Sequence, residues 1–291
     1  MPKQITIISG KGGTGKTTLT SSLAFLASGT AVFADADVDA PDLHLILHPT
    51  VIAEDELFIS KKVKRDEEKC TKCNLCGEVC EFKAINSSDL NYFKCEGCGL
   101  CVHMCPEKAL HLESIFSAKI FESKTRFGFF VHAEMAIGEG TSGRIVDQIR
   151  QKARKIAEQQ NKDYIIIDGS PGIGCPVIAS ITGVDLACII VEPTLSGIHD
   201  LERIFQVTQH FKVKSVVCIN KYDLNKHNSD NIIQFCNENN IKVVGKIPFN
   251  EIVPESIIQG KSTFELPENP VSDQITKIWE NIRKAMSRYL I

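Results

Sequence analysis

The chain has 291 residues, of which 43% are hydrophobic and 24% charged, and its formal net charge is −3. These values are typical of a globular protein with one large domain or two ordinary ones, and they give no sign of a dedicated nucleic-acid surface. No apolar run reaches the length that spans a bilayer, and no signal-peptide profile opens the chain, so we expect a cytoplasmic protein. In a reducing compartment, twelve cysteines indicate metal binding rather than disulfides.

A glycine-rich turn follows the first predicted strand. Residues 4–8 are apolar and β-branched, as in a buried strand, and residues 19–27 have a helical pattern. Between them, Gly10-x-x-x-x-Gly15-Lys16-Thr17 has the P-loop spacing in the strand–turn–helix context that a P-loop requires. Such a turn directs backbone N–H groups and the positive end of a helix at one place, where Lys16 and Thr17 also lie. The turn therefore predicts a site for a nucleoside triphosphate with Mg²⁺.

Two further predicted strands end in carboxylates. Residues 30–34 run into Asp35-Ala36-Asp37-Val38-Asp39-Ala40-Pro41-Asp42, and residues 164–167 run into Asp168, which is the Walker B pattern. Ligands of open α/β sheets bind at the carboxyl ends of the strands. We therefore expect Asp37, and after it Asp39, to face magnesium or the attacking water, and Asp168 to reach the magnesium shell. The glycine-rich loop that follows Asp168 is suited to order and relax as the γ-phosphate binds and leaves.

Eight of the twelve cysteines form two runs with the spacing of bacterial ferredoxins. In that motif three cysteines of a run hold one [4Fe–4S] cluster, and the fourth serves the other cluster. The predicted ligands of the first cluster are Cys70, Cys73, Cys76 and Cys105. Those of the second cluster are Cys95, Cys98, Cys101 and Cys80, the last of which precedes glutamate where such motifs usually carry proline. Two zinc sites are the alternative, but zinc sites rarely repeat this quartet spacing.

The cysteines lie in a region that interrupts the α/β pattern. The composition changes at Glu54, and residues 61–69 form a solvated, mixed-charge stretch that suggests a domain border. The two cysteine runs also repeat outside the cysteines, since residues 81–85 echo residues 107–110. A module this small has little core, so the clusters would supply much of its folding free energy. We predict an inserted ferredoxin-like domain over residues 58–116, within a discontinuous P-loop domain over residues 1–57 and 117–291.

The rest of the chain continues the α/β alternation. Helical patterns and apolar runs predict helices over residues 43–47, 144–160 and 196–210, and strands over residues 127–135, 186–191, 213–219 and 241–247. The strand over residues 213–219 runs into Asn220-Lys221-Tyr222-Asp223, in which the asparagine suits a purine edge and the aspartate suits guanine, as in many GTPases. Adenine and guanine are therefore both candidates for the base. Pro248 and Phe249 follow the next strand and are placed to close over the base.

The fold class that these elements predict is α/β. We expect a P-loop NTPase with a mostly parallel sheet flanked by helices, and a small α+β insert that is like a bacterial ferredoxin. Near the C-terminus, one helical stripe contains Ile275, Ile278, Trp279, Ile282, Met286 and Leu290. We expect this stripe to pack on the sheet of its own domain, and a membrane-seeking helix is the alternative.

The motifs together resemble a known family. The run from Lys11 to Thr18 carries an extra lysine near the start of the loop, and Asp35-Ala36-Asp37 and Asp168-Gly169-Ser170-Pro171 accompany it. This set resembles the deviant Walker A ATPases of the MinD/ParA/Mrp group, to which the nitrogenase iron protein is related. With the cysteine runs included, the chain resembles MinD-superfamily P-loop ATPases that carry an inserted ferredoxin domain, and the resemblance covers essentially the whole chain.

The resemblance implies a role for each site residue. Lys16 and the loop amides would hold the β- and γ-phosphates, Thr17 would bind Mg²⁺, and Asp168 would support the magnesium shell. Asp37 would position the attacking water, and Lys11 would reach the partner's phosphates across an ATP-bridged dimer. Asn220 would contact the base. The candidate nucleotide-binding residues are therefore Gly12, Gly13, Thr14, Gly15, Lys16, Thr17, Thr18, Asn220, Asp223 and Pro248.

Four further cysteines lie outside the two ferredoxin-like runs, and one of them has a counterpart in the same family. The nitrogenase iron protein bridges its dimer with one cluster held by two cysteines per subunit. Cys175 lies at the position of one of them, but no cysteine stands near Thr141, where the other would fall. The C-terminal Cys-x-x-Cys of Mrp-type carriers is also absent from the sequence. We therefore expect no bridging cluster and interpret Cys175 as structural or incidental to the redox chemistry. Three more cysteines are interpreted as core residues: Cys188, Cys218 and Cys236.

Three functions fit these features. The leading hypothesis is an ATPase that works as a homodimer, or as a heterodimer with a related ATPase. Its cycle of ATP (or GTP) and Mg²⁺ would control electron transfer through two [4Fe–4S] clusters to a redox or acceptor protein. The second is a maturation or carrier ATPase for an iron–sulfur or other metal cofactor, and the third is a MinD/ParA-like positioning switch with structural clusters. No nucleic-acid partner and no membrane contact are expected.

Overall fold

The structure, a computed structural model, describes residues 1–140 and 142–287. Thr141 and Leu290, which the sequence analysis uses, lie outside the described residues. The chain divides into two compact units. Unit 1 consists of Met1–Glu54, Ile120–Ala133 and Ser142–Ile291, and unit 2 consists of Asp55–Lys119 and Glu134–Thr141. Each unit is described by itself.

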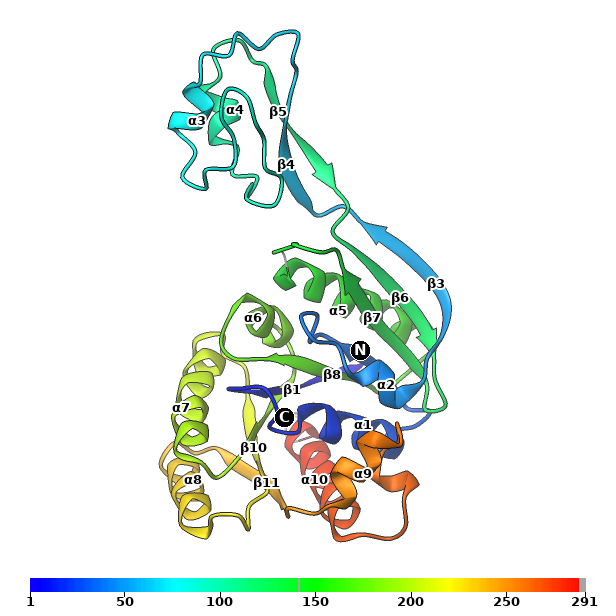
Figure 1. Cartoon of the computed structure of the whole chain (residues 1–291). Coiled ribbons are helices and arrows are strands. Elements are labelled where there is room, and N and C mark those ends of the chain that lie inside the picture. Colours follow the sequence, from blue (N-terminus) through cyan, green and yellow to red (C-terminus); the bar gives the residue numbers. More distant parts are fainter. Residues whose placement is uncertain (141, 288–291) are drawn as a thin grey trace. The chain divides into compact units, whose positions relative to one another are not determined.

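A nine-stranded sheet with the order β11-β10-β9-β1-β8-β2-β7-β6-β3 supports unit 1 (Figure 1). All neighbouring pairs from β11 to β7 are parallel, which confirms the predicted mostly parallel sheet. The central strands are apolar along their length because helices cover both of their faces. The strand bounds are β1 Lys3–Ser9, β2 Ala31–Asp35, β3 Thr50–Leu57, β6 Ala118–Lys124, β7 Phe129–Met135, β8 Tyr164–Pro171, β9 Leu186–Val191, β10 Ser215–Asn220 and β11 Lys242–Ile247.

Helices flank this sheet on both sides, as a parallel sheet with crossover connections requires (Figure 1). Their bounds are α1 Lys16–Leu26, α2 Leu43–Leu47, α5 Ser142–Gln159, α6 Cys175–Ile181, α7 Leu195–His210, α8 Lys226–Glu238, α9 Ile252–Ile258, the 3₁₀ helix η1 Thr263–Glu265, and α10 Pro270–Ser287. No helix in the described part of the chain is long and apolar enough to cross a bilayer.

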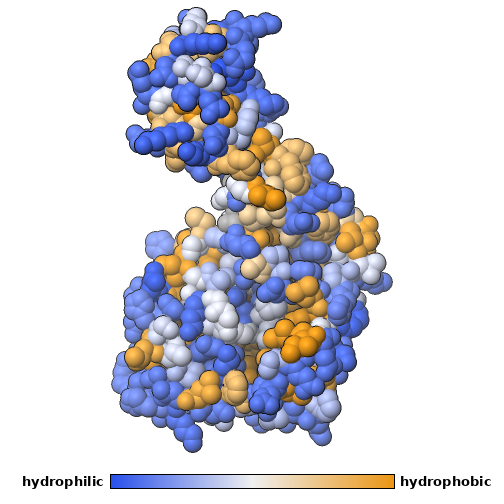
Figure 2. All heavy atoms as spheres, in the orientation of Figure 1, coloured by the Kyte–Doolittle hydropathy of each residue, from blue (hydrophilic) through white to orange (hydrophobic). Residues whose placement is uncertain are grey.

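The apolar stripe of α10 belongs to the core of unit 1. Ile275, Ile278 and Ile282 are fully buried, and they share one hydrophobic cluster with α1 and with alternate residues of the strands. Trp279 meets the ring of Tyr164 edge to face at 5.2 Å. The expectation that the stripe packs on its own sheet is thereby confirmed for the described residues. On the face drawn in Figure 2, hydrophobic residues form separate groups among hydrophilic ones.

His132 on β7 is packed among aromatic rings within unit 1. Its imidazole stacks on Phe130 at 4.8 Å and on Phe121 at 5.0 Å between ring centroids. Burial, and after it the charge of the nearby His44, lowers the pKa of His132 to about 4. The folded state therefore holds this side chain neutral at a pH where an exposed histidine takes up a proton.

We expect the stability of unit 1 to fall as the pH drops from about 6.5 to about 4. In this window the unfolded chain binds a proton at position 132 that the folded chain excludes, so the unfolding free energy decreases by up to about 3 kcal/mol. Chemical denaturation at pH 7 and pH 4.5 measures the change. His132→Phe, which keeps the aromatic packing, should lose much of this pH dependence. An unchanged pH dependence in the variant would contradict the assignment.

Unit 2 is built on a small antiparallel sheet of β4 Ser60–Arg65 and β5 Leu110–Ile115, which pair from Ser60 with Ile115 to Arg65 with Leu110. Two short helices complete it, α3 Leu75–Glu78 and α4 Leu100–Met104. Its hydrophobic cluster contains few residues, and cysteines are among them: Val63, Ala84, Ile85, Cys95, Cys101 and Leu110. This composition leaves the unit short of apolar core.

The two cysteine runs of unit 2 have matching backbones. The second residue after the first cysteine has a positive φ in both runs, 57° at Lys72 and 62° at Gly97. The same holds three residues after the fourth cysteine, at Lys83 with φ 50° and Lys108 with φ 51°. Asparagine and glycine tolerate such angles, but lysine takes them at a cost. The shared angles therefore indicate that one backbone design is repeated.

The structure differs from the sequence-based expectations in unit 2. The charged stretch over residues 61–69 contains strand β4, so it is not simply a solvated border. Lys62 and Val63 on this strand are buried. Unit 2 also includes Glu134–Thr141, which the predicted boundaries leave outside the insert. In this segment Glu139 accepts a hydrogen bond from the Ser60 hydroxyl at 2.6 Å.

Candidate functional site

The P-loop connects β1 to α1 and has the backbone that its glycines allow. Gly13 and Gly15 have φ angles of 75° and 95°, in the left-handed region that favours glycine. Gly10 has no room for a side chain, since a Cβ there would lie 2.2 Å from the Cβ of Asp200. The N-terminus of α1 follows directly, so its free N–H groups point into the loop.

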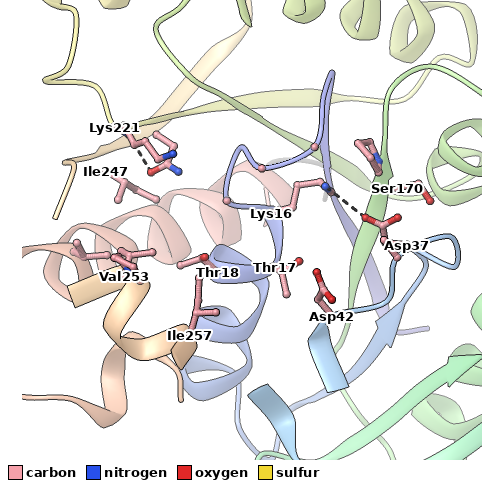
Figure 3. Close-up of a pocket in the computed structure, with 18 of the residues that line it drawn as sticks. Lys16, Thr17, Thr18, Asp37, Asp42, Ser170, Lys221, Ile247, Val253 and Ile257 are labelled. Atoms are coloured by element: carbon pink, nitrogen blue, oxygen red, sulfur yellow. Dashed lines mark hydrogen bonds and ion pairs between the residues drawn. The ribbon is translucent and has the colours of Figure 1, made fainter. Parts of the chain in front are cut away.

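Lys16 and Asp37 face each other across the pocket at the end of this loop (Figure 3). Lys16 is 5% exposed, and its Nζ lies 3.6 Å from Oδ2 of Asp37. The pocket has a volume of about 790 Å³, enough for a nucleotide, and its wall includes Gly12, Gly13, Gly15, Thr17, Thr18, Asp39 and Ser170. The structure thus brings the predicted phosphate-binding residues and both predicted aspartates of the β2 loop to one cavity.

Thr17 and Asp168 are in direct contact. The Thr17 hydroxyl donates to Oδ2 of Asp168 at 2.7 Å, and the Thr20 hydroxyl donates to Oδ1 at 3.0 Å. Thr20 is not one of the site residues that the sequence predicts. It lies one turn after Lys16 on the same face of the helix, so this spacing could have indicated that it belongs to the site. Thr17 and Asp168 form a pair of oxygen groups that suits a hard cation such as Mg²⁺.

Two buried aspartates, Asp35 on β2 and Asp168 on β8, have raised pKa values. Burial raises the pKa of Asp168 to about 6. Burial, and then the charge of Asp168, raise the pKa of Asp35 well above its ordinary value. Asp35 is nonetheless held by the backbone N–H groups of Asp37 and Leu43, at 3.1 Å and 3.2 Å. Asp35 therefore shapes the loop that carries Asp37, and a bound divalent cation would favour the charged form of its neighbours.

The other end of the pocket is apolar and lies where a base would bind. Ile247, Val253 and Ile257 line it (Figure 3). Pro248 lines it too, as does Asn220, whose Nδ2 donates to the Thr14 carbonyl oxygen at 2.8 Å. Asp223 does not line the described pocket, and its Oδ1 accepts the Phe249 N–H at 2.8 Å. Asn220 thus braces the P-loop, and Asp223 holds the turn after β11.

Lys11 is placed differently from the other loop residues. Its Nζ lies 3.6 Å from Oε2 of Glu192, and 3.4 Å and 3.3 Å from the hydroxyl oxygens of Thr194 and Ser196. Glu192 also accepts a hydrogen bond from Lys221 at 2.6 Å. Lys11 is therefore held by its own chain, on the β9–α7 connection. This contact could not be predicted from the sequence, because Lys11 and Glu192 are far apart along the chain.

Two cavities in unit 2 are each lined by four cysteines. The first cysteine cavity is lined by Cys70, Cys73, Cys76 and Cys105. The second cysteine cavity is lined by Cys95, Cys98, Cys101 and Cys80. In each case three cysteines come from one run and the fourth comes from the other run. These are the two sets of four that the ferredoxin spacing predicts, including the exchange of the fourth cysteine.

The fourth cysteine of each run has the same environment. The Ala84 N–H donates to Sγ of Cys80, and the Ala109 N–H donates to Sγ of Cys105, each at 3.3 Å. The two halves of the unit therefore share this contact as well as their backbone angles. Among residues 1–140 and 142–287, no three His, Cys, Asp or Glu side chains are grouped closely enough to hold a single metal ion. The cysteines therefore surround cavities and do not converge on one point.

Cysteines outside unit 2 are distributed as the sequence suggests. Cys175 is exposed at the start of α6. Cys188, Cys218 and Cys236 are buried, and burial raises the pKa of each thiol. These three are therefore inert core residues.

The fold and the pocket define a P-loop nucleotide-binding protein of the ATPase class. A family model described as the CobQ/CobB/MinD/ParA nucleotide binding domain matches residues 5–264. The chain belongs to this family. It is a P-loop ATPase, and the predicted family resemblance is confirmed at this level.

Individual relatives agree with this assignment. An uncharacterized protein of Methanocaldococcus jannaschii is 35% identical over 285 residues, which cover 97% of this chain and 96% of the relative. The light-independent protochlorophyllide reductase iron-sulfur ATP-binding protein of Chloroflexus aurantiacus is 24% identical over 161 residues, 53% of this chain and 57% of that protein. The cell division ATPase MinD of Pyrococcus furiosus has the same fold, with a TM-score of 0.61 at 16% identity over 98% of this chain and 99% of that chain.

Proposed function

We propose that the chain is an ATPase whose nucleotide state controls redox work at two [4Fe–4S] clusters in unit 2. The observation that carries the proposal is the pair of cysteine cavities, each lined by one predicted quartet. Similarity to a relative named an iron-sulfur ATP-binding protein supports it. When bound, the clusters supply one-electron transfer. A zinc ion would hold four sulfurs at about 2.3 Å from one point, so four cysteines around a cavity fit a cluster better.

In unit 1, different groups bind the phosphates of ATP, the Mg²⁺ ion and the base. The loop amides and Lys16 hold the β- and γ-phosphates, and Lys16 and the α1 N-terminus compensate their charge. Thr17 and Asp168 provide oxygens for the magnesium shell. Asp37 lies 3.6 Å from Lys16, so a water beside it is positioned next to the γ-phosphate. The apolar end of the pocket, with Pro248, receives the base.

In unit 2 the cysteines hold the clusters as thiolates. Backbone N–H groups of Ala84 and Ala109 stabilise the thiolates of Cys80 and Cys105. Exchange of the fourth cysteine would link the two halves of the unit, so each bound cluster would add to the stability of the unit. Cys73 and Cys98 are the exposed members of their quartets, which places one ligand of each cluster near solvent and a partner protein.

The test is an anaerobic redox titration of the full-length protein, without nucleotide, with ADP, and with a non-hydrolysable ATP analogue. We expect the nucleotide to shift at least one midpoint by about 60 mV, which is a tenfold change in a one-electron equilibrium. Iron release to an apo-acceptor is assayed in parallel. If the midpoint potentials are the same with and without nucleotide and iron is transferred to the apo-acceptor, the results contradict the proposal and favour a cofactor carrier. Liposome binding that needs ATP and survives cluster loss would favour a positioning switch.

The dimer is part of the proposal, and Glu192→Gln tests it. Lys11 must leave Glu192 to reach a partner's phosphates, and we take about 0.5–1 kcal/mol for this half-buried ion pair. We expect the variant to dimerise two- to fivefold more tightly with an ATP analogue, as measured by analytical ultracentrifugation. Asp185→Asn, which breaks the surface pair with Lys3, is the matched control and should change nothing. If wild type and Glu192→Gln dimerise equally tightly, the proposed role of Lys11 in the dimer contact is wrong.

A further inference from the structure

Arg65, the last residue of β4, carries a buried charge. Its side chain is only 5% exposed. Two of its nitrogens donate to backbone carbonyl oxygens, Nη1 to Ser87 at 2.8 Å and Nη2 to Asn86 at 2.5 Å. The Nε is also buried, and it has no hydrogen-bond partner in the described part of the chain. The Glu67 carboxylate lies 3.8 Å from Nε, but its side chain is 69% exposed and therefore well solvated.

The Arg65 side chain lines the first cysteine cavity, together with that cavity's four cysteines. Buried donors are almost always satisfied, and a buried charge is costly unless something of opposite sign accompanies it. Arg65 has no buried carboxylate among the ion pairs described for it. A guanidinium left in this state at a cavity wall indicates an anionic occupant of the cavity.

The second cysteine cavity has a different wall. None of the described residues that line it is a lysine or an arginine, and the charged one among them is Glu96. Lys62 is buried near this cavity, but its Nζ donates to the Cys95 carbonyl oxygen at 2.5 Å and does not line the wall. The first cavity has Arg65, Lys72 and Glu107 on its wall, so the two cavities match in their cysteines and differ in the charged residues that line them.

The internal repeat shows the same asymmetry. Arg65 stands five residues before Cys70, the first cysteine of its run. The residue five positions before Cys95 is Leu90, which is partly buried against the core of unit 2. One half of the repeat therefore carries a buried cation where the other half carries an apolar side chain.

We propose that Arg65 raises the reduction potential of the first cluster. The inference rests on the proposed function, because it presupposes the two clusters. Reduction adds one negative charge to a cluster, and a fixed cation nearby in a medium of low dielectric stabilises the reduced form more than the oxidised one. Net charge and hydrogen bonds to the sulfurs are the quantities by which proteins set cluster potentials.

The test is an anaerobic titration of the full-length protein with dithionite and mediators, followed by electron paramagnetic resonance. Cys73→Ala, which removes a ligand of the first cluster, should lose one of the wild-type midpoint potentials and thereby identify the midpoint of the first cluster. Arg65→Gln should lower that midpoint by at least 59 mV, a tenfold change for one electron, and leave the midpoint of the second cluster unchanged. Arg65→Lys, which keeps the charge, should retain most of the potential.

Lys72→Gln is the matched control, because Lys72 lines the same cavity but is exposed and screened. It should shift the midpoint much less than Arg65→Gln does. If the Arg65→Gln protein does not hold the first cluster, Glu67→Gln is measured in its place and should raise the midpoint of the first cluster slightly. A first-cluster midpoint that stays unchanged in Arg65→Gln, or equal shifts in the Arg65 and Lys72 variants, would overturn the inference. Protein without iron after reconstitution would instead contradict the proposed function.

Discussion

Lys16→Ala is expected to abolish nucleotide binding and reduce ATP hydrolysis roughly 10²–10³-fold or more. The ammonium group is almost fully buried and is the cation that faces Asp37 in the pocket. Its loss removes the positive charge that compensates the phosphates and leaves Asp37 without its partner. Burial already raises the pKa of Asp37, so the unpaired carboxyl is further favoured in its protonated form.

Phosphate release and binding of a fluorescent ATP analogue measure this effect, and the visible absorbance of the clusters reports on unit 2. The absorbance should match wild type, because the cysteine cavities are lined only by residues of unit 2. Lys3→Ala, which removes a surface lysine of unit 1, is the control and should hydrolyse ATP normally. Hydrolysis that persists in Lys16→Ala would exclude the P-loop as the site, and joint loss of absorbance would show that the units depend on each other.

The P-loop architecture could be predicted because its determinants are local. The turn from Gly10 to Thr17 needs glycines at fixed offsets, and the strand residues that precede Asp35 and Asp168 are continuous apolar runs. The carboxyl ends of parallel strands then bring these residues together without further information. Helix α2, predicted over residues 43–47, has these bounds in the structure.

What could not be predicted depends on contacts between distant segments. Strand β4 is hidden in a charged run, since Lys62 and Arg65 are buried there by partners that lie later in the chain. The hydrogen bonds of Asn220 with Thr14 and of Asp223 with Phe249 also join distant segments, and the sequence did not predict them. From composition alone, every lysine and arginine is expected to be solvated. Only the fold shows which lysine and arginine side chains are buried.

The exchange of the fourth cysteine is expected to decide which cluster a variant loses. Cys105 belongs to the second run, yet it lines the cavity of the first run's cysteines, and Cys80 has the reverse position. Cys105→Ala should therefore remove the first cluster and halve the iron content, and Cys80→Ala should remove the second. Iron analysis after anaerobic reconstitution measures both. Single variants alone do not reveal which cluster is lost, so pairs of substitutions are needed.

The double variants give opposite results under the two possible pairings. Cys73 and Cys105 line one cavity, so Cys73→Ala with Cys105→Ala should still hold one cluster. Cys98 and Cys105 line different cavities, so Cys98→Ala with Cys105→Ala should hold none. If each run held its own cluster, the first pair would lose all iron and the second would keep half. Since both doubles remove two thiols from the same small unit, a general loss of stability would lower both iron contents alike and cannot imitate the difference.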